Sequence, residues 1–190
     1  MFLNEREADE HTDKLFADDQ QYMGFVMNAT RAWSWSPQGF DKLFDFMAHV
    51  TPGMSMRERG LLVVASMSAF GDSYCSLAWG GKLAAETDAA TAASVIAGTD
   101  EGLTDAEREL VRWVRLVVRD PNATTQADID RLRAAGFDDQ RIFGVTAFAA
   151  ARMAFSAIND ALGARPDAEL REFSGPEVVA AVTFGRPIQD

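Results

Sequence analysis

Apolar residues recur along most of the chain at spacings of three and four, which is the period of one face of an α-helix. The first clear stripe consists of Phe40, Leu43, Phe44, Met47 and Val50. Pro52 and Gly53 end that helix. The next segment, Leu61 to Phe70, is apolar nearly all round, so we expect it at the centre of the core. No segment alternates as a strand does, and the sequence therefore predicts an all-α protein.

Polar residues mark the starts of the predicted helices. Ser55 with Glu58, and Thr104 with Glu107, have the spacing of a capping box, in which a hydroxyl and a carboxylate each accept from a backbone amide. The other predicted helix caps are Asp72, Thr87, Thr125, the C-terminal cap Gly136, and Asp138. Asp138 opens the longest helix, which we expect to run to about Leu162.

That longest helix carries an apolar stripe and several alanines that let a second helix approach closely. The stripe consists of Phe148, Ala151, Phe155, Ile158 and Leu162. Gly80-Gly81 weakens an earlier helix by about 2 kcal/mol relative to alanine, and such a pair indicates close backbone packing or a bend. Residues 164–190 are interrupted by prolines and Gly175, and we expect them to be a loosely structured tail.

The composition limits which partners and cofactors the protein could bind and where in the cell it could be located. The net charge of −11 over 190 residues repels phosphate backbones and anionic lipid, so we expect no nucleic-acid or membrane partner. The start of the chain is acidic, unlike a signal peptide. The single cysteine, Cys75, excludes an intramolecular disulfide and favours the cytoplasm. With only His11 and His49 as imidazoles, we expect no metal and no other cofactor.

One stretch, from Gly71 to Gly80, contains a side chain that could take part in a reaction, the thiol of Cys75. The thiol lies three residues after the predicted cap Asp72, at the positive end of the helix dipole, which lowers a thiol pKa. The Asp72 carboxylate opposes this by like-charge repulsion. The sequence leaves open which effect is larger, and also whether Cys75 is simply an inert small apolar residue.

Several short motifs, in order, resemble the alkylhydroperoxidase D-like branch of the carboxymuconolactone decarboxylase superfamily, including its uncharacterised peroxidase-related members. The motifs are Gly24-x-Val26-x-Asn28, Met56-Arg57-Glu58-Arg59, Ser73-Tyr74-Cys75 and Leu132-Arg133-Ala134-Ala135-Gly136-Phe137. The resemblance covers residues 18–172 and implies one helical domain there. Residues 1–17 would form an acidic N-terminal segment and residues 173–190 a C-terminal tail.

Redox-active members of this family carry Cys-x-x-Cys-x-x-x-His and a glutamate on the preceding helix. One thiolate attacks the peroxide, the second thiol resolves the sulfenic acid, and glutamate and histidine transfer protons. The resemblance places Cys75 at the second cysteine, Asp72 at the first, Trp79 at the histidine and Gly60 at the glutamate. Aspartate cannot resolve a sulfenic acid, and neither glycine nor tryptophan can relay a proton in this way.

Other residues that suggest a site have ordinary structural explanations. His49 ends a predicted helix, where a cation favours the dipole. Tryptophans of this number usually anchor a core or a subunit interface; they are Trp33, Trp35, Trp79 and Trp113.

Three functions follow from these observations. The first is a degenerate relative that keeps the fold, and a pocket for a small apolar or acidic molecule, without efficient two-cysteine peroxidase activity. The second is a one-cysteine thiol peroxidase or antioxidant in which an external thiol reduces Cys75. The third is a cysteine-independent lyase or isomerase acting on a small acid, with Asp72 as an acid–base candidate. A basic cluster that would hold an anionic substrate is not evident in the sequence.

The family resemblance also implies a homo-oligomer, as a dimer, trimer or hexamer, and the aromatic residues and alanine-rich helix offer contact surface. Multi-angle light scattering at micromolar concentration should therefore give a mass at least twice that of one chain. A mass equal to one chain would contradict the expectation.

Overall fold

The computed structural model describes residues 1–4, 6–7 and 9–190, and every regular element in those residues is helical. The predicted all-α class is confirmed. The elements are α1 (Glu10–Met23), α2 (Asn28–Trp33), α3 (Pro37–Val50), α4 (Met56–Phe70), α5 (Ser73–Glu86), α6 (Ala89–Ala97), α7 (Asp105–Arg119), the 3-10 turn η1 (Pro121–Ala123), α8 (Gln126–Ala134), α9 (Asp139–Ala161), α10 (Leu170–Ser174) and α11 (Pro176–Ala181).

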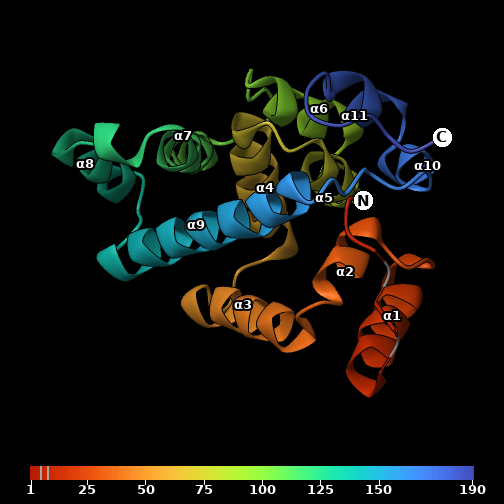
Figure 1. Ribbon diagram of the computed structural model, residues 1–190. Coiled ribbons are helices and arrows are strands. Elements are labelled where there is room, and N and C mark those ends of the chain that lie inside the picture. Colours follow the sequence, from red (N-terminus) through yellow and green to blue (C-terminus); the bar gives the residue numbers. More distant parts are fainter. Residues whose placement is uncertain (5, 8) are drawn as a thin grey trace.

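Helix α4 forms the centre of the core, as its all-round apolar sequence predicts. It packs against α5, α6, α7 and α9, and Leu61 to Ala65 have no exposed surface. The long helix α9 crosses the molecule, with α3 on one side and α7 on the other, and α1 and α2 lie beyond α3 near the N-terminus (Figure 1). The site described below lies where α1, α2, α3, α5 and α9 meet.

The helix caps agree with the sequence in most places and differ in two. Thr104 and Glu107 form the predicted capping box around the start of α7. At α6 the cap is Asp88, whose carboxylate accepts from the Thr91 amide at 2.8 Å, and not Thr87, whose hydroxyl donates back to the carbonyl of Leu83. A carboxylate accepts more strongly than a hydroxyl, and this explains the shift by one residue.

Only half of the capping box predicted at α4 is present. The Ser55 hydroxyl accepts from the amide of Glu58 at 3.1 Å. The Glu58 carboxylate, however, forms an ion pair with Arg141 at the start of α9 instead of returning to the Ser55 amide. A full charge on a neighbouring helix is a stronger partner than a backbone amide.

The segment after α9 is folded, contrary to the loosely structured tail expected for residues 164–190. Helices α10 and α11 pack on α5 and α6 and bury Leu170, Ser174 and Val178. A Cβ on Gly80 would lie 2.5 Å from Val178, and one on Gly81 would lie 2.9 Å from Phe173. The glycine pair thus marks close packing, and its partners come from the expected tail.

Two of the predicted segment boundaries fall inside helices. Helix α1 runs from Glu10 to Met23 across residue 17, and α10 runs from Leu170 to Ser174 across residue 172.

Helix α9 is long and apolar enough, by length and composition alone, to cross a membrane. The same properties belong to the core helix of a helical domain. In this fold 56% of its most apolar stretch is buried, and it packs against α3, α4 and α7.

Phe155 of α9 joins α2 and α3 to its own helix through aromatic contacts. Its ring stacks on Trp33 of α2 at 5.4 Å between centroids and meets Phe44 of α3 edge-on, also at 5.4 Å. The indole of Trp33 donates to the Asn159 side chain at 3.0 Å. These contacts hold α2 and α3 against α9.

We predict that Phe155→Ala lowers the free energy of unfolding by about 3–5 kcal/mol, because it leaves a cavity among packed rings. Phe143→Ala is the matched control on the same helix. That ring is 68% exposed, so its removal should change stability by about 0.5 kcal/mol or less. Urea unfolding of the two variants measures both, and equal effects would contradict the prediction.

Candidate functional site

Cys75 lies in the first turn of α5, directly behind the junction with α4. Gly71 ends α4 with a φ of 92°, a left-handed conformation that favours glycine. Asp72 is extended and caps α5, its Oδ1 accepting from the Cys75 amide at 3.1 Å. This tight junction turns the first residues of α5 toward α9. The thiol is free and only 3% exposed.

Two side chains of α9 contact the Cys75 sulfur. An Nη of Arg152 donates to Sγ at 3.1 Å, and the Ser156 hydroxyl lies 3.5 Å from the same atom. Ser156 also donates to the second oxygen of Asp72. Since residues 152 and 156 are one turn apart, they present their polar groups on one face of α9. Thiol, carboxylate, hydroxyl and guanidinium therefore form one buried cluster.

Burial is the largest influence on Cys75 and raises the pKa of its thiol well above the ordinary value. The charge of Asp72 raises this pKa further, while Arg152 and the Ser156 hydroxyl act to lower it. The sequence left open whether the helix dipole or Asp72 dominates. In the fold, desolvation exceeds the influence of Asp72 and adds to it, so the thiol is protonated at neutral pH.

A pocket of 390 Å³ opens beside this cluster. Its size is at the lower end of the roughly 300–1,000 Å³ typical of small-molecule sites. The lining comes from five helices and is mostly apolar. It consists of Leu15, Asp18, Asp19, Tyr22, Met23, Met27, Ala29, Phe40, Asp41, Phe44, Tyr74, Cys75, Ala78, Trp79, Lys82, Arg152 and Phe155.

The predicted site residues occupy different positions around this pocket. Cys75 and Trp79 line it, and Asp72 lies behind Cys75 with no exposed surface. Gly60, at the position of the family's glutamate, is elsewhere: a Cβ there would lie 3.2 Å from Leu83. This close contact between α4 and α5 leaves no room for a longer side chain without movement. His49 is exposed near the end of α3, outside the pocket.

Sequence reasoning missed Arg152 and Lys82. Arg152 is 3% exposed, although it lies in α9 between the apolar positions Phe148 and Phe155. A lone arginine within an apolar stripe was the available signal, because a buried charge requires a specific partner. Lys82 lies near the other end of α5, with its Nζ 4.7 Å from the centre of the Trp79 ring.

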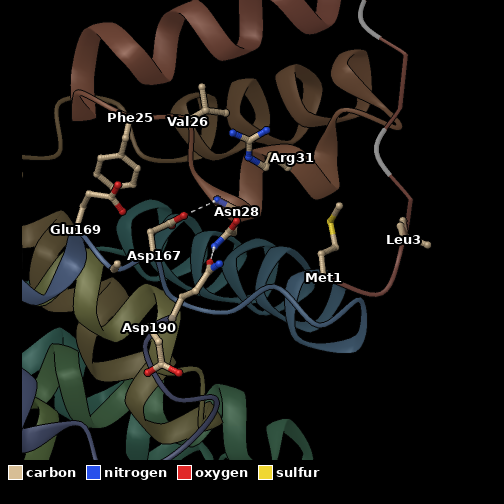
Figure 2. A pocket seen from close by; sticks show the side chains of 11 residues that line it. Met1, Leu3, Phe25, Val26, Asn28, Arg31, Asp167, Glu169 and Asp190 are labelled. Carbon is tan, nitrogen blue, oxygen red and sulfur yellow. Dashed lines mark hydrogen bonds between the residues drawn. The ribbon is translucent and has the colours of Figure 1, made fainter.

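A second pocket, of 530 Å³, lies between α2 and the two ends of the chain. Figure 2 shows Asn28 beside Asp167, whose carboxylate accepts from the Asn28 backbone amide at 3.0 Å. The Asn28 side chain also donates to the side chain of Gln189 at 2.8 Å. Asp167 also accepts from the Tyr74 hydroxyl, and burial raises the pKa of the Asp167 carboxyl. These bonds tie the C-terminal segment to α2, and the pocket is a structural junction.

No group of three or more histidine, cysteine, aspartate or glutamate side chains in the described residues could hold a metal ion.

Comparison with known proteins finds similarity in structure. No protein-family profile and no curated protein matches the sequence. An uncharacterized peroxidase-related protein from Ralstonia eutropha JMP134, with an alkylhydroperoxidase AhpD core, superposes with a TM-score of 0.81 at 22% identity, covering 92% of this chain and 97% of that one. A peroxidase-related protein from Silicibacter sp. TM1040 gives 0.78 at 20% identity over 93% and 95%.

The chain has the alkylhydroperoxidase D-like fold. The resemblance seen in the short motifs is therefore confirmed for the fold. The debrominase Bmp8 shares this alkylhydroperoxidase D-like arrangement, with a TM-score of 0.72 at 16% identity over 89% of this chain and 92% of that one. At these identities the similarity shows a common fold and leaves the activity to the chemistry of the site.

We predict that Asp72→Asn lowers the pKa of the Cys75 thiol by about 1–2 units, because it removes a buried like charge while asparagine still caps the helix. Alkylation of Cys75 measured as a function of pH reports this pKa. Asp18→Asn is the control, since Asp18 lines the pocket but is absent from the principal influences on the thiol. An unchanged profile in Asp72→Asn would contradict the assigned role of Asp72.

Proposed function

We propose that this protein is a one-cysteine thiol oxidoreductase that reduces small organic hydroperoxides, with Cys75 as nucleophile and an external thiol as reductant. The proposal rests on one observation: Cys75 lines a mostly apolar pocket, and its sulfur accepts a hydrogen bond from the buried Arg152 guanidinium at 3.1 Å. A guanidinium at this distance stabilises the thiolate over the thiol. A closed apolar plug would have favoured the degenerate function instead.

The chemistry proceeds in balanced steps. Hydroxide from solvent removes the thiol proton, and Arg152 stabilises the resulting thiolate. The thiolate attacks one peroxide oxygen, the O–O bond breaks, and Cys75 becomes a sulfenic acid. The departing alkoxide takes a proton from water and leaves as an alcohol, which regenerates hydroxide. One external thiol then displaces water from the sulfenic acid, and a second releases Cys75 and a disulfide.

A two-cysteine cycle does not fit this chain. Cys75 is its single cysteine, and Asp72 occupies the position where the family carries the other sulfur. The raised thiol pKa also keeps the resting thiolate population small at neutral pH. We therefore infer slow turnover, and a cytoplasmic location would supply the external thiol.

A second candidate is the degenerate, non-catalytic binding protein. The observation that favours it is the burial of Cys75 beside Asp72, which raises the thiol pKa. A solved complex supports a small aromatic occupant in either case. A cysteine-to-alanine variant of the debrominase Bmp8 with bound 2,3,4-tribromopyrrole superposes on this chain with a TM-score of 0.68 at 17% identity, over 86% of this chain and 89% of that one.

The third function, a lyase or isomerase, requires no thiol. Arg152 and Lys82 supply the basic pair that the sequence did not reveal. Substitution of Cys75 separates this function from the first.

We predict slow consumption of cumene hydroperoxide with excess monothiol, and its loss in Cys75→Ser. The rate should rise with pH from about 6 to 9, because a raised pKa means that the reactive thiolate grows throughout that range. Peroxide consumption followed at several pH values measures both effects. Circular dichroism of Cys75→Ser controls for folding.

Two outcomes would contradict the proposal. Consumption by Cys75→Ser at the wild-type rate would remove the thiol from the mechanism. Absence of consumption by the wild type at pH 9 would favour the non-catalytic binding protein.

A further inference from the structure

Two cations converge on one aromatic ring inside the Cys75 pocket. The Lys82 ammonium lies 4.7 Å from the centre of the Trp79 ring, and the Arg152 guanidinium carbon lies 5.8 Å from it. The same guanidinium lies 5.0 Å from the Phe155 ring. Both cations therefore contact the Trp79 ring, and Cys75 lies one turn before Trp79 on the same helix.

Arg152 is buried without an anionic partner. It is 3% exposed, one Nη donates to the Cys75 sulfur, and its Nε is buried with no hydrogen-bond acceptor. Among the residues that the structure describes, neither Arg152 nor Lys82 forms an ion pair within 4.0 Å of a carboxylate. A buried charge and an unused donor both cost stability unless an acceptor arrives. The cluster thus lacks an anion that would pair with Arg152 and accept a hydrogen bond from its Nε.

The carboxylates around the pocket do not fill this role. Asp72 is engaged with the Cys75 amide and the Ser156 hydroxyl. Asp19 accepts from the Met27 amide at 2.8 Å, and Asp18 and Asp41 line the pocket from α1 and α3.

The influences on the pKa of Lys82 also indicate that the two cations lack an anionic partner. Burial lowers the pKa of Lys82 and the nearby Arg152 lowers it further, against weaker opposing influences from Cys75 and Asp19. Arg152 of α9 and Lys82 of α5 therefore lie close enough to repel one another across the Trp79 ring.

We propose that Arg152 and Lys82 form an anion subsite, and that the molecule bound in the Cys75 pocket is a small aromatic acid. Its carboxylate lies between the two cations, and its ring lies against the apolar walls formed by Phe40, Phe44 and Phe155. A volume of 390 Å³ accommodates one or two fused rings. The inference rests on the proposed function only in taking this pocket as the substrate site, because carboxylate binding needs no thiol.

The test compares 2-naphthoate with 2-naphthamide, which has nearly the same shape and no charge. Isothermal titration calorimetry at pH 7 should show the wild type binding the acid about tenfold more tightly than the amide. Lys82→Gln should weaken binding of the acid about fivefold or more and leave the amide unchanged. Lys42→Gln is the matched control, because Lys42 is exposed on α3 outside the pocket, and it should change neither affinity.

Equal affinity of the wild type for acid and amide would overturn the subsite, as would an unchanged preference in Lys82→Gln. The first comparison needs no variant, so it holds even if a substitution disturbs folding. Cys75→Ser should keep the preference for the acid. Selective binding without peroxide turnover would contradict the proposed function alone, whereas turnover without selectivity would contradict the subsite alone.

Discussion

The buried carboxylate of Asp72 joins α5 and α9, two of the five helices that line the pocket. One oxygen accepts from the Cys75 amide and fixes the start of α5, and the other accepts from Ser156 of α9. Because Arg152 lies one turn before Ser156, the same contact brings a guanidinium to the sulfur. Without this carboxylate the first turn of α5 would lose its cap and α9 its polar anchor.

The same arrangement both positions the Cys75 thiol and opposes its ionisation. The charge that caps the helix also opposes formation of the thiolate, and burial adds to that opposition. Arg152 offsets part of it. A bound anion would compete with the sulfur for the guanidinium, so occupancy of the pocket and reactivity of Cys75 are coupled through Arg152.

Much of the fold follows from local sequence signals. The helical periods and the Asp72 cap are set by residues close together in the chain, and both are present. The Gly80-Gly81 pair correctly predicted close packing, although its partners Val178 and Phe173 lie far away in the chain. The predicted Thr87 cap was one residue from the observed Asp88 cap because neighbouring polar residues compete for the same amides.

The site was only partly predictable from sequence. Cys75, Asp72 and Trp79 could be named from a short motif on one helix. Arg152 reaches the sulfur from 77 residues away, and the packing of α10 and α11 on α5 is equally distant in sequence. Periodicity reports which face of a helix is apolar but not which helix covers it. The charge of the pocket therefore required the tertiary structure.

The order of the elements along the chain has a consequence for biosynthesis. Helix α5 carries Cys75, whose sulfur is contacted by side chains of α9, and α10 and α11 pack on the same helix. All three of these helices are translated later. A nascent chain that has emerged only through α5 has neither Arg152 nor Val178 to cover that helix. Arg152 and Ser156 thus reach the thiol only after α9 has left the ribosome, and until then Cys75 depends on the reducing power of its surroundings.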